Sequence, residues 1–507
     1  MRLDCFSREI AFPHLLINPD DETLYGLCAH EAQATKYGSI NFITTVRNRS
    51  ARDTYVVDTV ELGRRQQPIA DSRAREIAGE VNEYLRDRRV IQLDRRMGGE
   101  GWLRAHCRLF VTEPYARLAF MWKRSLFPPD DAASPPDFVS IYVPEWPERV
   151  IFVHPEAGVT YILGTDYFGE AKKSFLRMAM YREKGRNRLG FHAASKVIRV
   201  CCGDETSRDT GFLIFGLSGT GKTTLTTHDH GLVGPEGVIV RQDDVVIMDE
   251  KMYCAGTENG FFIKTEGLGK DGPDDPIYRA ARSPRAIFEN VVVDERGELH
   301  FDDTGLTANG RAVIPRSEFP CTDDGIDLER VQNLVFITRR NDILPPVARL
   351  TPEQAAGYFM LGESVETSAG DPNAIGQARR EVGTNPFVIG AEAEEGNRLL
   401  RFLRLNTGTR CYLLNTGSIG GNVKISVKDS AMILEQIARD AIEWERDEDW
   451  GYEVPKVLPG LDIGKLRPDT YYDPEDYRRR VDALRRERRE WLSAFLGLNP
   501  AITNCFE

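Results

Sequence analysis

The feature that most constrains the fold of this chain is a complete phosphate-binding loop at residues 216–223, with the sequence G-L-S-G-T-G-K-T. The apolar run at 212–215 before it predicts a buried strand, and residues 223–225 after it predict the first turn of a helix. In such a loop the glycines let successive backbone N–H groups converge on phosphate oxygens, and the helix N-terminus adds partial positive charge. The strand–loop–helix order therefore predicts that the chain binds a nucleoside triphosphate.

Side chains of this loop and of a nearby acidic pair predict how the triphosphate and its metal ion are held. Lys222 is expected to reach the β- and γ-phosphates, and the Thr223 hydroxyl is expected to hold Mg²⁺. Asp243 and Asp244 follow the strand-like run 237–240, and a carboxylate at the end of a neighbouring strand can hold a divalent cation. The predicted nucleotide contacts along the loop are Gly216, Leu217, Ser218, Gly219, Thr220, Gly221, Lys222, Thr223 and Thr224.

Composition narrows the class of protein. The length of 507 residues allows two or three domains, and the formal net charge of −12 argues against broad binding to nucleic acid or anionic membranes. The chain contains no run of about 18 apolar residues, and nothing near its N-terminus resembles a signal peptide. Its nine cysteines lack C-x-x-C spacing, which favours reduced thiols over structural zinc. Together these features predict a cytoplasmic protein that binds neither nucleic acid nor membranes.

The order of apolar runs predicts an α/β protein. Strand-like runs recur from about residue 191 onward, including 197–200, 238–240, 287–293 and 334–338, so this part of the chain carries the nucleotide site. A stretch at 362–385 is rich in Gly, Asp, Glu and Thr and predicts a mobile lid. Residues 475–495 predict an amphipathic helix whose arginine-rich face is expected to be solvated and paired with glutamates.

Motifs along most of the chain resemble ATP-dependent phosphoenolpyruvate carboxykinases, and the phosphate loop has that family's own form. The segments that carry the resemblance occur in the family's order: R-S-A-R-D at 49–53, G-T-D-Y-F-G-E-A-K-K at 164–173, F-H-A-A-S at 191–195, L-T-A-N-G-R at 306–311, L-P-P-V-A-R-L-T-P at 344–352, N-T-G at 415–417 and K-I-S at 424–426. The resemblance implies two α/β lobes, an N-terminal oxaloacetate-binding lobe at 1–190 and a C-terminal nucleotide-binding lobe at 191–507 with a mixed sheet.

The resemblance also implies a reaction. The family converts oxaloacetate and ATP to phosphoenolpyruvate, CO₂ and ADP, reversibly, through an enolate that attacks the γ-phosphoryl group. Negative charge builds on the enolate, and cations fixed in a dry cleft offset it. Lysine as a metal ligand must be neutral, so neighbouring cations such as Lys172 are expected to depress the pKa of Lys173.

Site residues carried over from the family fall into three groups. The implied ligands of a transition metal, expected to be Mn²⁺, are Lys173, His192 and Asp244, with Mg²⁺ at Thr223. The implied substrate contacts are Arg49, Tyr167, Lys173 and Arg311, and the implied catalytic residues are Lys172, Lys173, Lys222 and Arg311. Beyond the phosphate loop, the implied nucleotide contacts are Lys424, Ile425 and Ser430.

The chain departs from the family pattern near the nucleotide. Of the usual G-D-D-E-H-G-W segment only the aspartates remain, Ser418 stands where the family has tryptophan, and Lys196 stands at an asparagine position. Two other functions therefore stay open: a kinase on the same scaffold with another acceptor, for which His228, His230 or Asp243 would be the general base, and a nucleotide sensor without catalysis. Nucleotide preference, reaction direction and oligomeric state, monomer or small homo-oligomer, also stay open.

Overall fold

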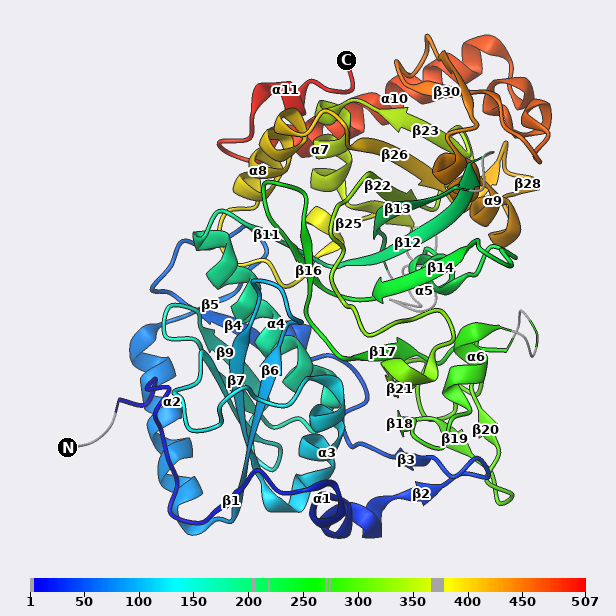
Figure 1. The fold of residues 1–507 in the computed structure, drawn as a ribbon. Helices are drawn as coiled ribbons and strands as arrows, with labels where there is room; N and C mark the ends of the chain where they lie inside the picture. Colours follow the sequence, from blue (N-terminus) through cyan, green and yellow to red (C-terminus); the bar gives the residue numbers. More distant parts are fainter. Residues whose placement is uncertain (1–3, 203–205, 218, 270–271, 273–274, 366–377) are drawn as a thin grey trace. The chain divides into compact units, whose positions relative to one another are not determined.

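A computed structural model describes residues 4–202, 206–217, 219–269, 272, 275–365 and 378–507 (Figure 1). The chain divides into two compact units, each built from three segments. The first unit comprises Met1–Gly190, Ala255–Pro320 and Phe387–Ala391, and the second comprises Phe191–Cys254, Cys321–Pro386 and Glu392–Glu507. The division after Gly190 falls where the sequence places the lobe boundary, but residues 255–320 and 387–391 return to the first unit.

The first unit is built around an eight-stranded sheet of order β1-β6-β7-β8-β10-β9-β4-β5. Alternation along β8 assigns its two faces. Val139, Ile141 and Val143 pack into the core that α2 covers, whereas Ser140 Oγ lies 2.8 Å from Ser174 Oγ of α4, on the other face. The elements are β1 (Leu15–Ile17), α1 (Asp21–Cys28), β4 (Thr54–Val57), β5 (Pro68–Ile69), α2 (Asp71–Tyr84), β6 (Val90–Met97), β7 (Ala105–Thr112), α3 (Ala116–Ser125), β8 (Phe138–Val143), β9 (Val150–His154), β10 (Val159–Leu163) and α4 (Phe168–Gly185).

A five-stranded sheet of order β17-β21-β18-β3-β2 explains why residues 255–320 belong to the first unit. β18 pairs in parallel with β3, which comes from the N-terminal segment. The predicted strand at 287–293 is wrong as one element, because Asn290 adopts a φ of 60° and its side chain accepts a hydrogen bond from Thr44 N at 2.8 Å. The elements are β2 (Gln33–Ala34), β3 (Ile40–Phe42), β17 (Gly260–Lys264), α6 (Pro276–Ala281), β18 (Ile287–Glu289), β19 (Val292–Val293), β20 (Leu299–His300) and β21 (Arg311–Pro315).

The second unit contains a mixed sheet of order β14-β12-β13-β22-β26-β23-β30-β29. β12 is antiparallel to both β13 and β14, so those two strands run in the same direction, and β22 and β26 run parallel to β13. The carboxyl ends of β13, β14, β22 and β26 therefore lie at the same edge. The strands are β12 (Ala193–Cys202), β13 (Thr206–Phe215), β14 (Gly237–Gln242), β22 (Asn333–Thr338), β23 (Val347–Leu350), β26 (Arg410–Asn415), β29 (Glu443–Arg446) and β30 (Glu453–Val457).

Helices pack on both faces of this sheet. The Phe215 ring stacks on Phe336 at 4.9 Å and contacts Phe359 of α7 at 6.0 Å. Lys196 of β12 points to the opposite face, where it donates to the Leu225 carbonyl of α5. The helices are α5 (Lys222–Thr227), α7 (Pro352–Leu361), α8 (Glu392–Leu405), α9 (Val427–Arg439), α10 (Pro474–Ser493) and α11 (Pro500–Thr503), and the remaining short strands are β11 (Leu189–Phe191), β15 (Val246–Met248), β16 (Cys254–Gly256), β24 (Glu363–Val365), β25 (Ala378–Arg380), β27 (Ser418–Ile419) and β28 (Val423–Lys424).

Half of the predicted lid at 362–385, residues 366–377, lies outside the described residues. The two flanks of the segment, β24 and β25, pair as an antiparallel ladder. Gly362 ends α7 in the left-handed conformation with a φ of 47°, and a Cβ there would lie 1.6 Å from the Glu381 carbonyl oxygen. The lid itself stays a prediction.

The arginine-rich helix α10 differs from the expectation at one position. Arg488 is 0% exposed, and its guanidinium donates to Glu363 Oε1 at 2.8 Å and to the Tyr358 hydroxyl at 3.0 Å. Burial alone would raise the pKa of Glu363, but the charges of Arg488, Arg340 and Arg380 lower that pKa to about 2. Arg488 is therefore paired with a glutamate as predicted, but the pair lies inside the core rather than in solvent.

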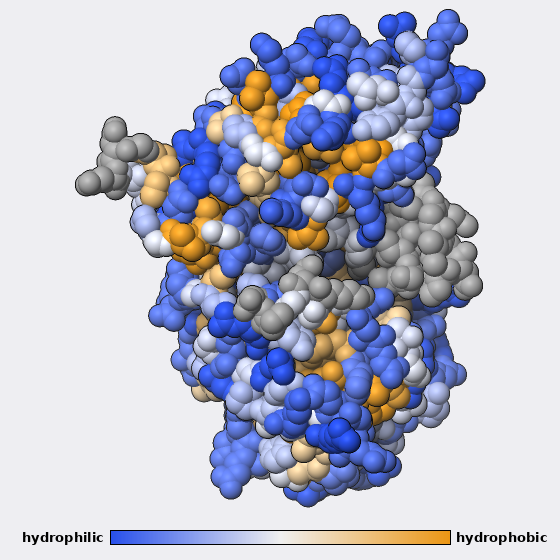
Figure 2. Space-filling model, turned by 90° about the vertical axis from the view of Figure 1, so that its right-hand side faces the viewer, coloured by the Kyte–Doolittle hydropathy of each residue, from blue (hydrophilic) through white to orange (hydrophobic). Residues whose placement is uncertain are grey.

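The surface face shown in Figure 2 is largely hydrophilic with scattered hydrophobic patches. Within the described ranges, no helix combines the length and the apolar character needed to cross a membrane. Two of the larger exposed apolar side chains are Leu405, the last residue of α8, and Leu496, which follows α10. Isolated residues of this kind are normal on a protein surface.

Candidate functional site

The predicted nucleotide segments meet at the carboxyl edge of the mixed sheet. The phosphate loop follows β13, Asp243 and Asp244 follow β14, and His192 immediately precedes β12, which runs antiparallel to both. Strand direction alone brings these three segments to one edge, where open α/β sheets bind their ligands.

The phosphate loop is shaped by glycine and held from a neighbouring strand. Gly219 and Gly221 have φ values of 81° and 93°, a region that residues with side chains rarely adopt. The Thr416 hydroxyl, just beyond β26, donates to the Thr220 carbonyl at 2.8 Å. Ser218, one of the predicted contacts, lies outside the described residues. The backbone of the described loop thus has the strained, anchored shape that a phosphate cradle needs.

Two cationic side chains border this loop. Lys222 Nζ donates to the Asp243 carbonyl at 3.0 Å, so the lysine spans from the start of α5 to the end of β14. Arg339, directly after β22, donates to the Gly219 carbonyl at 2.9 Å. Both charges lie where the β- and γ-phosphates of a bound nucleotide are expected.

His192 and Asp244 form the best-defined candidate metal site. His192 Nδ1 lies 2.8 Å from the Thr384 carbonyl oxygen, which can only accept, so Nδ1 carries the proton. His192 Nε2 faces Asp244 Oδ1 at 3.0 Å. In the neutral ring two lone pairs then face each other, an arrangement that a proton or a bound cation between them relieves. A histidine oriented by a carbonyl in this way is typical of metal ligands.

The donor set fits a divalent ion of borderline hardness, because it offers imidazole nitrogen and carboxylate oxygen. Among the described residues, no cluster of three or more His, Cys, Asp or Glu side chains could hold a metal. The further predicted ligands are the Lys173 amine and the Thr223 hydroxyl, and a bound triphosphate supplies its own oxygens.

The other predicted nucleotide contacts differ in exposure. Lys424 is exposed at the end of β28, whereas Ile425 is buried and its N–H donates to the Gly417 carbonyl at 3.0 Å. Ser430 lies in the first turn of α9, 1% exposed, and its hydroxyl donates to the Ser426 carbonyl at 3.1 Å. Lys424 is therefore accessible, whereas the Ile425 N–H and the Ser430 hydroxyl already have partners.

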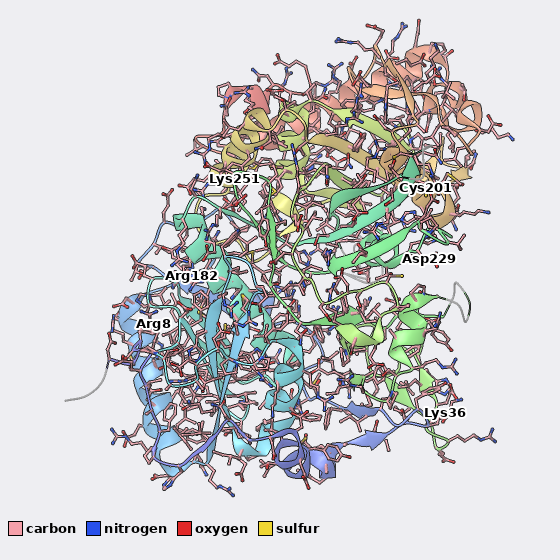
Figure 3. The ribbon with its side chains drawn as sticks, viewed as in Figure 1. Arg8, Lys36, Arg182, Cys201, Asp229 and Lys251 are labelled. Carbon is pink, nitrogen blue, oxygen red and sulfur yellow. The ribbon has the colours of Figure 1, made fainter. Side chains whose placement is uncertain are left out.

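Lys196, at the family's asparagine position, lies buried beside α5. Its Nζ contacts the Leu225 carbonyl and, at 2.7 Å, His230 Nε2. His230 Nδ1 lies 2.9 Å from the Ala431 carbonyl, so the ring is neutral with its proton on Nδ1. Burial lowers the pKa of Lys196 to about 7. Asp229, labelled in Figure 3, lies in the same loop after α5.

In the first unit, three cations surround one aromatic ring. The charged groups of Arg49, Lys173 and Arg177 lie 4.6, 4.9 and 5.7 Å from the centroid of Phe387. Lys173 and Arg177 are four residues apart on α4 and therefore share a helix face. Such a concentration of positive charge suits a substrate with several carboxylates.

Tyr167 and Arg311 lie in the same unit. The Tyr167 ring is 1% exposed, and a Cβ at Gly169 would lie 2.4 Å from its Cε1 atom, so only glycine fits there. Burial raises the pKa of Tyr167. Arg311 opens β21, and its guanidinium donates to Asn309 Oδ1 at 2.7 and 3.1 Å. Asn309 therefore orients the arginine that the sequence assigns to a carboxylate.

The adjacent lysine, Lys172, points elsewhere. Its Nζ lies 2.5 Å from Glu258 Oε2, and both side chains are 2% exposed. The Glu258 carboxylate offsets the Lys172 charge that was expected to act on Lys173, whereas Arg177 is a second cation of the same helix that shares the Phe387 ring with Lys173.

A buried acid lies at the start of α4. Glu289 of β18 accepts from Phe168 N at 2.8 Å through Oε1, whereas its Oε2 is buried without a hydrogen-bond partner within the described residues. Burial raises the pKa of Glu289 to about 8, so the group is mostly protonated at neutral pH.

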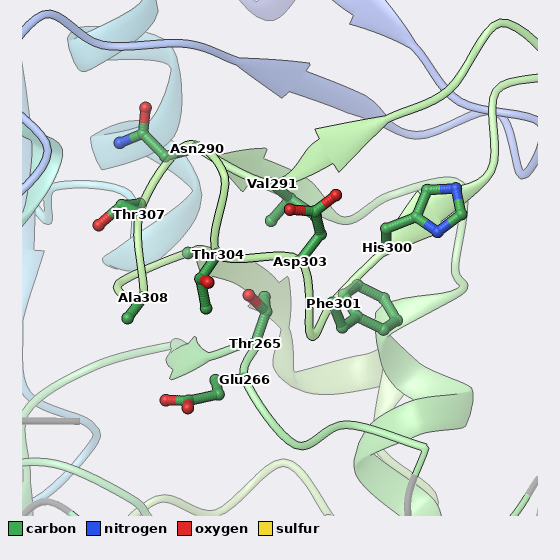
Figure 4. A pocket seen from close by; sticks show the side chains of 11 residues that line it. Thr265, Glu266, Asn290, Val291, His300, Phe301, Asp303, Thr304, Thr307 and Ala308 are labelled. Atoms are coloured by element: carbon green, nitrogen blue, oxygen red, sulfur yellow. The ribbon is translucent and has the colours of Figure 1, made fainter. Parts of the chain in front are cut away.

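A small polar pocket is lined in part by the segment that precedes Arg311 (Figure 4). Threonines 265, 304 and 307 contribute to its wall, together with Asp303 and His300. Thr307, Ala308 and Gly310 of the loop before Arg311 also line this pocket, which shares no lining residue with the cation cluster around Phe387.

Comparison with known proteins agrees with this geometry. The family model described as phosphoenolpyruvate carboxykinase, in its ATP-dependent form, matches residues 14–463. The chain belongs to this family. It is 39% identical over 401 residues, 78% of its length and 79% of the other's, to phosphoenolpyruvate carboxykinase (ATP) of Aeropyrum pernix. It is 27% identical to the proteins of the same name from Rhizobium leguminosarum bv. trifolii, covering 90% of this chain and 87% of that one, and from Thermus thermophilus, covering 91% and 89%.

In each of the two units, residues to which the sequence analysis assigned no role contact predicted site residues of this carboxykinase. Thr384 orients His192, Arg339 and Thr416 hold the phosphate loop, and Arg177 joins the cations around Phe387. Only Arg177 carried a usable signal, its four-residue spacing from Lys173 on a predicted helix.

Proposed function

We propose that this chain, like its family, converts oxaloacetate and ATP to phosphoenolpyruvate, CO₂ and ADP in a reversible reaction, using the residues described above. The observation that carries the proposal is the group of cations around Phe387 in a chain that also has a phosphate loop. A generic kinase has no need for several arginines and lysines around one acceptor, whereas a dicarboxylic acid does.

The roles of the residues follow from their chemistry. Backbone N–H groups of the loop and the Lys222 amine bind the triphosphate, and Arg311, oriented by Asn309, offsets charge on the substrate and on the transferred phosphoryl group. Arg49 binds a substrate carboxylate through a planar, permanently charged group. Burial of Tyr167 keeps water from the carboxyl group that leaves as CO₂, which protects the enolate from protonation.

His192 and Asp244 are the residues whose geometry supports metal binding, and Lys173 and Thr223 are proposed to complete the sets for Mn²⁺ and Mg²⁺. A divalent ion bound there would supply positive charge to the enolate oxygen and to the γ-phosphate. The choice between Mn²⁺ and Mg²⁺ is part of this proposal.

The alternative kinase reading loses one of its candidate bases. Both ring nitrogens of His230 are engaged, by Lys196 and by the Ala431 carbonyl, and burial lowers its pKa well below the usual value. His228 Nδ1 accepts from His230 N at 2.8 Å. A hydroxyl acceptor would thus depend on His228 or Asp243 among the candidates.

The test is an exchange assay. Purified protein with ADP, phosphoenolpyruvate and labelled bicarbonate is expected to form labelled oxaloacetate, with a further increase on addition of Mn²⁺. Lys222→Gln is expected to abolish the exchange, whereas Lys251→Gln, at an exposed lysine of the same unit (Figure 3), leaves it unchanged. Folded wild-type protein that binds ATP but shows no exchange in either direction would refute the proposal.

A further inference from the structure

Arg177 is a buried cation for which the described part of the chain offers no counter-ion. Its side chain is 7% exposed, yet within the part of the chain that the structure describes no carboxylate or carbonyl lies within ion-pairing or hydrogen-bonding distance of its guanidinium. Its contact is the Phe387 ring at 5.7 Å, and Glu170, an acid of the same helix, accepts from Ser50 N instead. Burial, opposed by the charge of Glu170 and aided by that of Arg49, lowers the pKa of Arg177 to about 10.

Other buried arginines show how this protein normally holds such a group. Arg117 is 1% exposed and pairs with Glu31 at 3.0 Å and Asp166 at 2.8 Å. Arg488 is 0% exposed and pairs with Glu363 at 2.8 Å. A buried charge is costly unless it is paired, and a cation–π contact compensates for only part of that cost. The missing partner of Arg177 is therefore expected to arrive with a ligand.

The position of the guanidinium defines the ligand. Arg177 and Arg49 lie against the same aromatic ring, and both groups have all their donors available. Two planar guanidinium groups of this kind suit a single carboxylate, which can accept from both through its two oxygens. We infer that Arg177 is a substrate-binding residue that, together with Arg49, binds the carboxylate that oxaloacetate and phosphoenolpyruvate share.

The choice between the two carboxylates of oxaloacetate follows from the chemistry. The leaving carboxylate loses its charge as CO₂ forms, so a permanent cation bound tightly to it would stabilise the ground state more than the transition state. The shared carboxylate keeps its charge throughout. A dry, fixed guanidinium at that group lowers the energy of substrate and transition state alike. This inference rests on the proposed function, because it takes oxaloacetate as the substrate.

The experiment compares Arg177→Gln and Arg177→Lys with Arg182→Gln, a control on the same helix whose side chain pairs with Asp137 instead (Figure 3). Titration calorimetry measures binding of oxalate, a small dicarboxylate, and separately of ATP. Steady-state assays give KM and kcat for oxaloacetate and for phosphoenolpyruvate. Thermal unfolding checks that each variant is folded, and the lysine variant keeps the charge if the glutamine variant does not fold.

Arg177→Gln is expected to weaken oxalate binding and to raise KM for both oxaloacetate and phosphoenolpyruvate by about 10- to 100-fold, the range of a lost charged hydrogen bond. ATP affinity should change less than twofold, Arg177→Lys should recover part of the loss, and Arg182→Gln should match wild type. Unchanged oxalate affinity in a folded variant, or a rise in KM for oxaloacetate alone, would overturn the inference. If wild type binds oxalate but shows no carboxykinase activity, and Arg177→Gln weakens oxalate binding, then the proposed function fails and the anion-binding role of Arg177 stands.

Discussion

Replacing Lys196 with methionine should change the stability of the protein in a pH-dependent way. Lys196 is 0% exposed, and burial lowers its pKa to about 7 from an ordinary value near 10.5. The folded state thus holds fewer protons than the unfolded state between pH 7 and 10.5. The cost of burying the charge is therefore fully present below pH 7 and fades as pH rises toward 10.5. A shift of 3.5 units corresponds to about 5 kcal/mol at pH 6 and to about 1 kcal/mol at pH 10.

Two lost hydrogen bonds oppose this gain. Methionine fits the apolar part of the site, but it leaves His230 Nε2 and the Leu225 carbonyl without their donor. Each unsatisfied buried group costs about 1 to 3 kcal/mol at any pH. The variant is therefore expected to be less stable than wild type at pH 10, and its stability relative to wild type is expected to be about 4 kcal/mol higher at pH 6 than at pH 10.

Thermal unfolding at pH 6 and pH 10 measures this difference. For a unit of this size 4 kcal/mol corresponds to a change of roughly 8 to 16 °C in the relative Tm of variant and wild type. Lys251→Met, at an exposed lysine of the same unit, is the control and should show no such pH dependence. A relative Tm of Lys196→Met that is the same at both pH values would refute the argument that Lys196 is desolvated.

Three further perturbations probe other buried groups. Glu289→Gln should be about as stable as wild type near pH 5 and increasingly more stable up to pH 8, where the difference reaches about 4 kcal/mol. The reason is that Glu289 keeps its proton in the folded state up to about pH 8, so wild type loses stability as pH rises above the unfolded pKa of this acid. Thermal unfolding measures the difference, and a relative stability that is flat across this pH range would contradict the prediction. Arg488→Met should destabilise by about 1.5 to 3 kcal/mol in denaturant unfolding, because it removes a charged hydrogen bond to the buried Glu363 carboxylate, which then depends on Arg380 alone for its close ion pair; a variant as stable as wild type would speak against the importance of this pair. His192→Gln should weaken Mn²⁺ binding in the presence of ATP at least tenfold by electron paramagnetic resonance, and unchanged binding would remove His192 from the ligand set.

The sequence predicted those parts of the site that local patterns encode. The phosphate loop is a contiguous motif whose glycines set its own backbone, so residues 216–223 were recognisable without a fold. To predict that His192 and Asp244 lie at the same edge of the sheet, one needs the directions of the strands as well as their positions. Periodicity does not give these directions, and the assignment of both residues to one site came from the resemblance to the family. The roles proposed for individual ligands and substrate contacts stay predictions.

Other features depend on tertiary contacts that no local pattern reports. Arg177 looks like any arginine on a helix until the structure shows that no carboxylate among the described residues pairs with it. Arg488 belongs to a strongly charged helix, and only the packing of Glu363 and two tyrosines against α10 explains its burial. The break at Asn290 in the predicted strand 287–293 arises from the hydrogen bonds of its side chain to Thr44, 246 positions away in the chain.

The discontinuous first unit has a consequence for biosynthesis. Its strand β21, which begins with Arg311, and its aromatic ring at Phe387 are translated long after residue 190, and its last segment ends only at Ala391 of a 507-residue chain. A ribosome must therefore release more than three quarters of the polypeptide before this unit can acquire all of its parts. A fragment ending at residue 190 should emerge with unpaired strand edges and without the ring that gathers its cations, and would need chaperones or aggregate.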